Sequence, residues 1–291
     1  MANEVWSALC VEVDAELAEA VANFLVEEGA PGLVEGDGAG AAGRVRLEAA
    51  IPDADCARVA DGLAGYLARL AALHPATRPA TIETSAVAAL DWTAVAQRHH
   101  RPVAIGRRLL VAPPWDVPEA PGREVLIIEP GMAFGTGQHA TTRGCLAAIE
   151  SAVGSGGVTS ALDVGTGSGI LALALARLGV PRVVAIDDDP HVLPIARENL
   201  ARNGAAQVEL VAGTAADVDA RFDLVVANLL ADILVREAAP LGERVASGGR
   251  LVVSGLLAAQ VDAVAAAYPG WQVADDHRDE GWCTLVLRRT R

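Results

Sequence analysis

A glycine-rich turn between a predicted strand and a predicted helix is the feature that most restricts the fold of this 291-residue chain. Residues 163–169 read DVGTGSG; an apolar run precedes them, and an apolar helical pattern follows over residues 170–178. Glycines in this position let backbone N–H groups and a helix N-terminus approach a ligand closely. The G-x-G-x-G spacing differs from the dinucleotide fingerprint, because its third glycine comes one residue too early.

Strands and helices alternate from about residue 160 onward, which predicts a parallel, doubly wound sheet. Two final strands follow each other without a helix, so we expect them to pair as an antiparallel hairpin at the sheet edge. The predicted fold is therefore α/β and Rossmann-like, with a mostly parallel seven-stranded sheet and an antiparallel edge strand. The expected strands are 161–164, 183–186, 208–211, 224–227, 250–254, 271–274 and 282–287, and the expected helices are 170–178, 191–203, 232–243 and 258–268.

The first part of the chain has a different pattern, which predicts a separate ferredoxin-like α+β domain over residues 1–89. Residues 90–121 are interpreted as a linker that leads into a second domain over residues 122–291, with short strands at 103–105 and 109–112. The β-α-β-β-α-β order of the first domain comes from strands at 5–13, 33–35, 45–50 and 82–87 and helices at 15–28 and 54–73.

Asp187 is the second candidate binding feature, because it ends the strand after the glycine turn, 22 residues beyond Gly165. A carboxylate at this place can accept hydrogen bonds from both hydroxyls of a ribose, so turn and carboxylate together predict an adenosine-type cofactor. The alternative is that the glycines only permit tight packing and that Asp187 caps a helix. Asp188 and Asp189 suit that capping role better.

Asn228 ends the fourth strand, at the sheet edge where open α/β folds bind ligands. Its amide could orient a nucleophilic amine through the carbonyl oxygen, or it could simply form a turn. Residues 130–142 form a glycine-dense segment that could fold over a cofactor. We expect Thr141 or Thr142 to cap the following helix and His139 to make a structural hydrogen bond.

The charge balance favours a basic partner over nucleic acid, because the net charge is −14 and residues 1–90 alone hold fourteen acids against five arginines. A simple solubility charge is the alternative. The chain has no lysine, which we attribute to coding bias. The four cysteines lie far apart, which indicates buried or idle thiols in a reducing cytoplasm and no metal site. Neither a secretory signal nor a membrane-spanning stretch is expected.

Several segments together resemble the ribosomal protein L-eleven methyltransferase family (PrmA), over nearly the whole chain. The resemblance implies a small N-terminal domain that recognises the ribosomal protein, a linker helix, and a class I methyltransferase domain that uses S-adenosylmethionine. It implies methylation of lysine side chains and of the N-terminal α-amine, with up to three methyl groups. The resembling segments are 92–115, 130–137 (PGMAFGTG), 165–169, 187–190, 227–231 (ANLLA), 254–258 (SGLLA) and 281–283.

The place of Asn228 at the sheet edge makes it the candidate catalytic residue, and the resemblance implies that Thr142, Gly165, Asp187 and Asn228 contact S-adenosylmethionine. We further expect a cytoplasmic monomer without a metal. Gln138, Ala140 and Thr166 stand where the family usually has threonine, proline and often cysteine, and the first two concern the identity of the target. The expected cofactor-binding residues are Thr142, Gly165, Gly167, Gly169, Asp187, Asn228, Phe134 and Gly135.

Methyl transfer from a sulfonium is an in-line displacement, so the protein mainly aligns the reactants and excludes water. The attacking amine must be neutral, and we expect a partly dry pocket around Asn228 and Phe134 to favour that form, with no dedicated base. One alternative is a lysine methyltransferase for another protein, such as an electron-transfer flavoprotein subunit. Another is a non-catalytic nucleotide-binding module. Leu229-Leu230 argues against glutamine-directed relatives, which carry Asn-Pro-Pro-Tyr, and the glycine spacing argues against an NAD-linked reductase.

Overall fold

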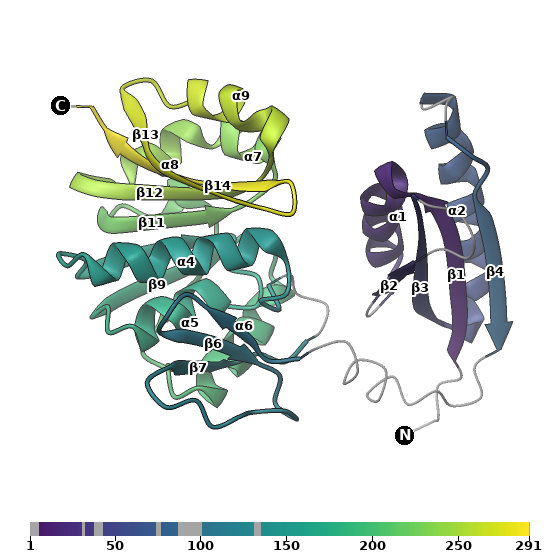
Figure 1. The fold of residues 1–291 in the computed structure, drawn as a ribbon, viewed down its shortest axis with the longest axis horizontal. Helices are drawn as coiled ribbons and strands as arrows, with labels where there is room; N and C mark the ends of the chain where they lie inside the picture. The colour runs from purple at the N-terminus through teal and green to yellow at the C-terminus, as the bar shows by residue number, and fades with distance from the viewer. Residues whose placement is uncertain are drawn as a thin grey trace. The chain divides into compact units, whose positions relative to one another are not determined.

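The computed structural model describes residues 6–30, 33–37, 43–73, 77–86, 101–130 and 135–290 (Figure 1). The chain forms two compact units, Met1–His99 and His100–Arg291. The linker helix that the family resemblance implies would fall largely on residues 87–100, which lie outside the described residues.

The first unit is a four-stranded antiparallel sheet with two helices packed on one face. The sheet order is β2-β3-β1-β4, and the element order matches the expected β-α-β-β-α-β pattern. Alternate residues of β1, such as Leu9 and Val11, face the helices and pack against Val21 and Leu63. The elements are β1 (Trp6–Asp14), α1 (Ala15–Glu27), β2 (Leu33–Asp37), β3 (Arg44–Pro52), α2 (Asp53–Leu73) and β4 (Thr81–Ala86).

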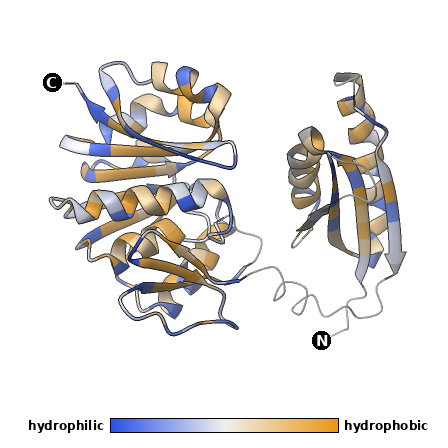
Figure 2. Cartoon of the chain, in the orientation of Figure 1, coloured by the Kyte–Doolittle hydropathy of each residue, from blue (hydrophilic) through white to orange (hydrophobic). Residues whose placement is uncertain are grey.

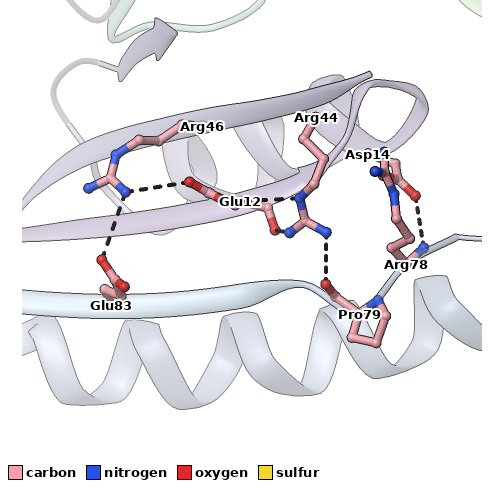
Figure 3. Close-up of polar contacts among 7 residues, drawn as sticks. All are labelled: Glu12, Asp14, Arg44, Arg46, Arg78, Pro79 and Glu83. Carbon is pink, nitrogen blue, oxygen red and sulfur yellow. Dashed lines mark hydrogen bonds and ion pairs between the residues drawn. The ribbon is translucent and has the colours of Figure 1, made fainter. Parts of the chain in front are cut away.

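Ion pairs connect the strands of this sheet on the face that alternates with its core residues (Figure 3). Arg46 lies 3.8 Å from both Glu12 on β1 and Glu83 on β4. Arg44 donates to the carbonyl oxygen of Glu12 at 2.6 Å. The backbone and side chain of Arg78 both donate to Asp14, which lowers the pKa of that carboxyl. Arg46, Arg78 and Glu83 are partly exposed, so each of their pairs contributes little to stability.

The second unit contains the seven-stranded sheet, in the order β10-β9-β8-β11-β12-β14-β13. Five strands are parallel and the chain ends in an antiparallel hairpin, which confirms the predicted mostly parallel sheet. The antiparallel strand β14 lies between β12 and β13, so the outermost strand is β13. The strands are β8 (Ser160–Val164), β9 (Arg182–Asp187), β10 (Glu209–Ala212), β11 (Phe222–Asn228), β12 (Val245–Leu257), β13 (Trp271–Asp279) and β14 (Trp282–Arg289).

Helices cover both faces of this sheet, and its central strands are the most apolar part of the unit (Figure 2). Alternate strand residues supply the two cores: Val226 and Val252 face α4 and α5, whereas Val225 and Val253 face the other side. Within the described residues, no helix is both long and apolar enough to cross a bilayer. The helices are α4 (Ala140–Gly154), α5 (Ile170–Arg177), α6 (Val192–Arg202), α7 (Ala231–Arg236), α8 (Ala238–Glu243) and α9 (Val261–Ala266), with short 3-10 turns at Ala215–Asp217 and Ala258–Gln260.

Two of the expected helices are interrupted. The helix predicted over 232–243 is two short helices, α7 and α8, which meet at Glu237. Pro240 explains the break, because its ring has no N–H and collides with the carbonyl four residues earlier in a continuous helix. The helix predicted over 258–268 begins as a 3-10 turn and becomes α-helical only from Val261 to Ala266.

A small three-stranded sheet precedes the large one. Strands β5 (Val103–Ile105) and β6 (Leu109–Ala112) occur where they were predicted, but β7 (Glu124–Ile127) was not predicted. Leu109, Val111 and Leu126 are buried in the same core as α4 and α5. Residues 101–128 therefore fold as part of the second unit and lead directly into the glycine-dense segment.

Candidate functional site

The glycine turn joins β8 to α5 in a conformation that requires glycine. Gly165, Gly167 and Gly169 all have positive φ, at 70°, 51° and 83°. The N–H of Gly165 donates to the carbonyl oxygen of Ile186 at 2.9 Å, which holds the turn beside the end of β9. A Cβ on Gly165 would lie 2.5 Å from Leu229 Cδ2. The turn therefore lies between the ends of β9 and β11.

Asp187 ends β9 and points toward this turn. Its Oδ2 accepts from the N–H of Gly167 at 2.9 Å, and its Oδ1 accepts from the N–H of Asp189 at 3.1 Å. The capping alternative does not hold, because the N-cap residue of α6 is His191. Asp189 accepts from the N–H of His191 at 2.8 Å, so it stabilises the turn that opens this helix. The Asp187 carboxylate thus bridges the glycine turn and the end of the neighbouring strand.

Asp163, the first residue of the DVGTGSG segment, lies fully buried beneath the turn. Its Oδ2 accepts from Thr166 Oγ1 at 2.7 Å and from the N–H of Ala172 at 3.1 Å. Its Oδ1 has no hydrogen-bond partner among the described residues. Burial raises the pKa of this carboxyl to about 7, although the bond from Thr166 opposes the rise. Asp163 therefore connects the turn to α5, and the free energy that its burial costs depends on pH.

This environment predicts a pH-dependent effect of Asp163→Asn on stability. Below the unfolded pKa of about 3.8 the acid is neutral in both states, so it imposes no penalty. Between that value and about 7 only the unfolded state ionises, so the wild-type protein loses stability as the pH rises. Asparagine cannot ionise, so the variant should gain about 2–3 kcal/mol relative to wild type between pH 5 and pH 8. Urea unfolding at both pH values measures this change, and a constant difference would contradict the assigned pKa.

The segment before helix α4 is held against the glycine turn. Ser168 Oγ donates to the carbonyl oxygen of Gly135 at 2.6 Å. Gly135 has a φ of 103°, and a Cβ there would lie 2.7 Å from Ser168 Oγ. The structure therefore places Gly135 beside the turn, as expected. Phe134, the other loop residue in the predicted set, lies outside the described residues.

Two asparagines that were not predicted as site residues support this arrangement, Asn199 in α6 and Asn203 at its C-cap. Asn199 Nδ2 donates to the carbonyl oxygen of Ser168 at 2.9 Å, and Asn199 Oδ1 accepts from the N–H of Glu129 at 3.1 Å. Asn203 exchanges two hydrogen bonds with the backbone of Ile127, at 2.8 and 2.6 Å. Both are buried. Asn199 lies inside the helix, where asparagine is unfavourable, and this was the available signal.

His139 is the N-cap residue of helix α4, so the prediction that Thr141 or Thr142 caps this helix is wrong. His139 has an extended backbone, and its Nδ1 accepts from the N–H of Thr141 at 3.3 Å. The helix starts at Ala140, so both threonines already lie in its first turn. The expected structural hydrogen bond of His139 is present.

Thr142 is fully buried, and its Oγ1 has no hydrogen-bond partner among the described residues. A buried hydroxyl without a partner is costly, and a bound ligand is one way to satisfy it.

Asn228 lies at the carboxyl end of β11, half-buried and paired in register with Ser254 on β12. Its Nδ2 donates to Thr141 Oγ1 at 3.3 Å. The following N–H, that of Leu229, donates to the carbonyl oxygen of Ser254 at 3.0 Å. Gly255 permits this path, because a Cβ there would lie 2.1 Å from the carbonyl oxygen of Leu229. Asn228 is thus brought to the same sheet edge as Gly165 and Asp187.

The hairpin β13–β14 is tied to the start of α4 by Arg143. Arg143 Nη2 lies 2.6 Å from Asp279 Oδ2 and 3.0 Å from Glu280 Oε2, and its Nη1 donates to the carbonyl oxygen of Gln138. Gln138 in turn donates to the carbonyl oxygen of Arg101 at 2.8 Å. Gln138, which stands where the family usually has threonine, therefore links the segment before α4 to the backbone at Arg101.

Cysteines and metal ligands play no visible part in this site. All four cysteines are unpaired and buried, as predicted. No group of three or more histidine, cysteine, aspartate or glutamate side chains that could hold a metal occurs in the described part of the chain.

These residues fit an adenosine-type cofactor. The turn brings the start of α5 to the sheet edge, and its three glycines with positive φ put no side chain between the backbone and a ligand. Asp187 offers a carboxylate where a ribose binds in such folds. Thr142 offers a buried hydroxyl that lacks a protein partner among the described residues. An amide at Asn228 completes the sheet edge.

Comparison with known proteins places the whole chain in one family. The family model described as ribosomal protein L11 methyltransferase (PrmA) matches residues 5–290. A ribosomal protein L11 methyltransferase of Geobacter sulfurreducens is 39% identical over 305 residues, covering 97% of this chain and 98% of that protein. The counterpart from Geobacter metallireducens is 45% identical over 202 residues, covering 68% of this chain and 66% of that protein.

A solved structure agrees with this assignment. The crystal structure of ribosomal protein L11 methylase from Lactobacillus delbrueckii subsp. bulgaricus is 31% identical, with a TM-score of 0.61, and covers 66% of this chain and 100% of its own. The predicted class I methyltransferase fold is therefore confirmed. Since a single family model spans both structural units, the chain belongs to the ribosomal protein L11 methyltransferase (PrmA) family.

Proposed function

We propose that this chain transfers methyl groups from S-adenosylmethionine to amines of ribosomal protein L11, both lysine side chains and the N-terminal α-amine. The observation that carries the proposal is the position of Asn228, a half-buried amide at the sheet edge beside the glycine turn and Asp187. Membership of the L11 methyltransferase family supports the same substrate, and it confirms the expected cofactor.

The cofactor would be held by the residues that meet at this edge. Asp187 would accept the ribose hydroxyls, and the start of α5 at the glycine turn would face the remainder of the molecule. The Thr142 hydroxyl would gain a partner. S-adenosylmethionine supplies a methyl group on a positively charged sulfur, which is already activated for displacement. The chain therefore has to bind, align and exclude water.

Asn228 would orient the amine. Its amide oxygen can accept a hydrogen bond from an amine N–H and carries no formal charge, so it accepts the neutral nucleophile without favouring the ammonium form. Lysine has a pKa of about 10.4 in water and an α-amine about 7.7–8.0, so a partly dry site is needed mainly for lysine. Water would carry the proton away, since among the described residues no acidic or basic side chain is hydrogen-bonded to Asn228.

The first unit would recognise the protein substrate. Residues 1–90 hold fourteen acids and five arginines, a balance that attracts a basic partner. Arg44, Arg46 and Arg78 are engaged by Glu12, Asp14 and Glu83, so the acid excess rests on other carboxylates. Action as a cytoplasmic monomer without nucleic-acid contact stays a prediction.

Mapping the modified amines tests the chemistry. Purified L11 would be incubated with the enzyme and S-adenosylmethionine, digested and analysed by mass spectrometry. Two matched substrates separate the amines: L11 with an acetylated N-terminus, and L11 with every lysine replaced by arginine. The proposal expects methylation of lysines in the first and of the α-amine in the second. Modification of glutamine instead, or of neither amine class, would contradict it.

A further inference from the structure

A chain of three polar side chains links the sheet edge to the cap of helix α4. Asn228 Nδ2 lies 3.3 Å from Thr141 Oγ1, and Thr141 Oγ1 lies 2.7 Å from His139 Nδ1. The backbone N–H of Thr141 also donates to His139 Nδ1, at 3.3 Å. Thr141 is only 2% exposed, so these contacts are sheltered from water.

The backbone bond fixes the direction of every proton in this chain. A backbone N–H can only donate, so His139 Nδ1 must be an acceptor and carry no hydrogen. The short contact between Nδ1 and Thr141 Oγ1 then requires the threonine hydroxyl to donate to the ring. With its proton used, Thr141 Oγ1 can only accept from Asn228.

This direction removes the ambiguity between the two ends of the Asn228 amide. The NH₂ group must face Thr141, so the carbonyl oxygen Oδ1 must face away from it. A reversed amide would place an oxygen against a hydroxyl oxygen that has no proton left to give. The amide oxygen is the atom that an attacking amine needs.

The surroundings of His139 keep its ring in the required state. The ring packs edge-on against Trp282, with 4.9 Å between centroids. Burial lowers the pKa of His139, and the positive charge of Arg143 on α4 lowers it further, whereas Glu280 in the hairpin turn opposes them. Asp279 faces the same corner but is engaged by Arg143. A neutral ring with hydrogen on Nε2 and an acceptor at Nδ1 is therefore favoured.

Contacts with β12 and β14 fix the position of Thr141. Ser254 Oγ contacts the carbonyl oxygen of Thr141 at 3.3 Å and Thr284 Oγ1 at 2.7 Å, and both residues are buried. Gly144, one turn further along α4, permits this contact, since a Cβ there would lie 2.2 Å from Thr284 Oγ1. The first turn of α4 therefore has a fixed place against β12 and β14.

We infer that Thr141 and His139 are positioning residues, which hold the Asn228 amide with its oxygen directed toward the amine to be methylated. The inference rests on the proposed role of Asn228. It gives His139 a part in the reaction without contact to the reacting atoms. Protonation of Nδ1 would turn that atom into a donor, which breaks the bond from the backbone N–H of Thr141 and reverses the bond with Thr141 Oγ1. The threonine proton is then free, and the Asn228 amide is no longer held in one orientation.

Matched substitutions test the inference by separating position from fold. Thr141→Val keeps the shape of the side chain and removes the hydroxyl, and we expect kcat to fall about 10-fold. Thr141→Ser keeps the hydroxyl and should stay within about 3-fold of wild type. The affinity for S-adenosylmethionine, measured by calorimetry, and the melting temperature should be similar in the two variants.

A second pair of substitutions tests the role of His139. Asparagine can place its Oδ1 where Nδ1 lies, so His139→Asn keeps both the cap and the acceptor but cannot be protonated. His139→Gln moves the amide one bond outward, and we expect about a 10-fold lower kcat than for His139→Asn. The ratio of wild-type to His139→Asn kcat should fall as the pH is lowered below the ordinary histidine pKa of about 6.5. The protonation of the substrate amine cancels in this ratio.

The outcomes distinguish this inference from the proposed function. If Asn228→Ala loses turnover while Thr141→Val and His139→Gln keep it, the inference is wrong and the role of Asn228 stands. If Asn228→Ala keeps its turnover, the proposed function of Asn228 fails first. If Thr141→Val loses kcat together with cofactor affinity and melting temperature, the role of Thr141 is structural and the inference is also wrong.

Discussion

Asn228→Ala is expected to lower kcat for methyl transfer at least about 100-fold at saturating S-adenosylmethionine. The amide lies at the end of β11 and is held by Thr141, so its oxygen is placed before the substrate arrives. Removing this oxygen leaves the substrate amine free to adopt unproductive orientations. Alignment of the reactants is the main contribution of the protein to catalysis. Single-turnover kinetics with bound cofactor measures this effect.

A control on the following helix separates this effect from general damage. Val235 of α7 is 44% exposed, and Val235→Ala should keep wild-type kcat. Calorimetric titration with S-adenosylmethionine shows whether the cofactor still binds to Asn228→Ala. Unchanged turnover at saturating cofactor would mean that the amine is oriented by other groups.

Asp187→Ala is expected to raise the Kd for S-adenosylmethionine about 100-fold, which corresponds to about 3 kcal/mol. Two hydrogen bonds from ribose hydroxyls to a carboxylate would account for it, since each bond to a charged group contributes about 1.5–3 kcal/mol. The substitution also releases the N–H of Gly167, which Asp187 accepts at 2.9 Å. Calorimetry or fluorescence titration gives the Kd directly.

The neighbouring acid offers a matched control. Asp188 is exposed and carries the same charge one residue along the chain. Asp188→Ala should therefore change the Kd by less than about 3-fold, because it removes only a screened charge. Equal losses for the two variants would indicate that bulk charge, and not a specific contact, determines cofactor affinity.

Much of the fold follows from local pattern. The alternation of apolar runs and turn residues located most strands of the two larger sheets, because most of them have a buried face. Strand β13 has no buried residue, and it extends to Asp279 where an end at residue 274 was predicted. Strand β7 was missed because a strand of only four residues carries little periodic signal. The break between α7 and α8 was missed because the pattern of apolar residues does not take the position of Pro240 into account.

The candidate site, like the fold, could be predicted only in part from the sequence. Gly165, Asp187 and Asn228 could be predicted because each stands directly after a strand, where the topology brings strand ends together. The contact of Asn228 with Thr141 spans 87 residues, and those of Asn199 and Asn203 with the segment before α4 span 70 and 76. No local pattern encodes such contacts. The capping role of His139 was missed because histidine is not among the usual cap residues.

The most direct test of the central claim is the intact mass of purified ribosomal protein L11 before and after incubation with this protein and S-adenosylmethionine. The account predicts mass increases in steps of one methyl group, which disappear when Asn228→Ala replaces the wild-type protein. No mass change, with binding of S-adenosylmethionine confirmed in parallel, would contradict L11 as the substrate.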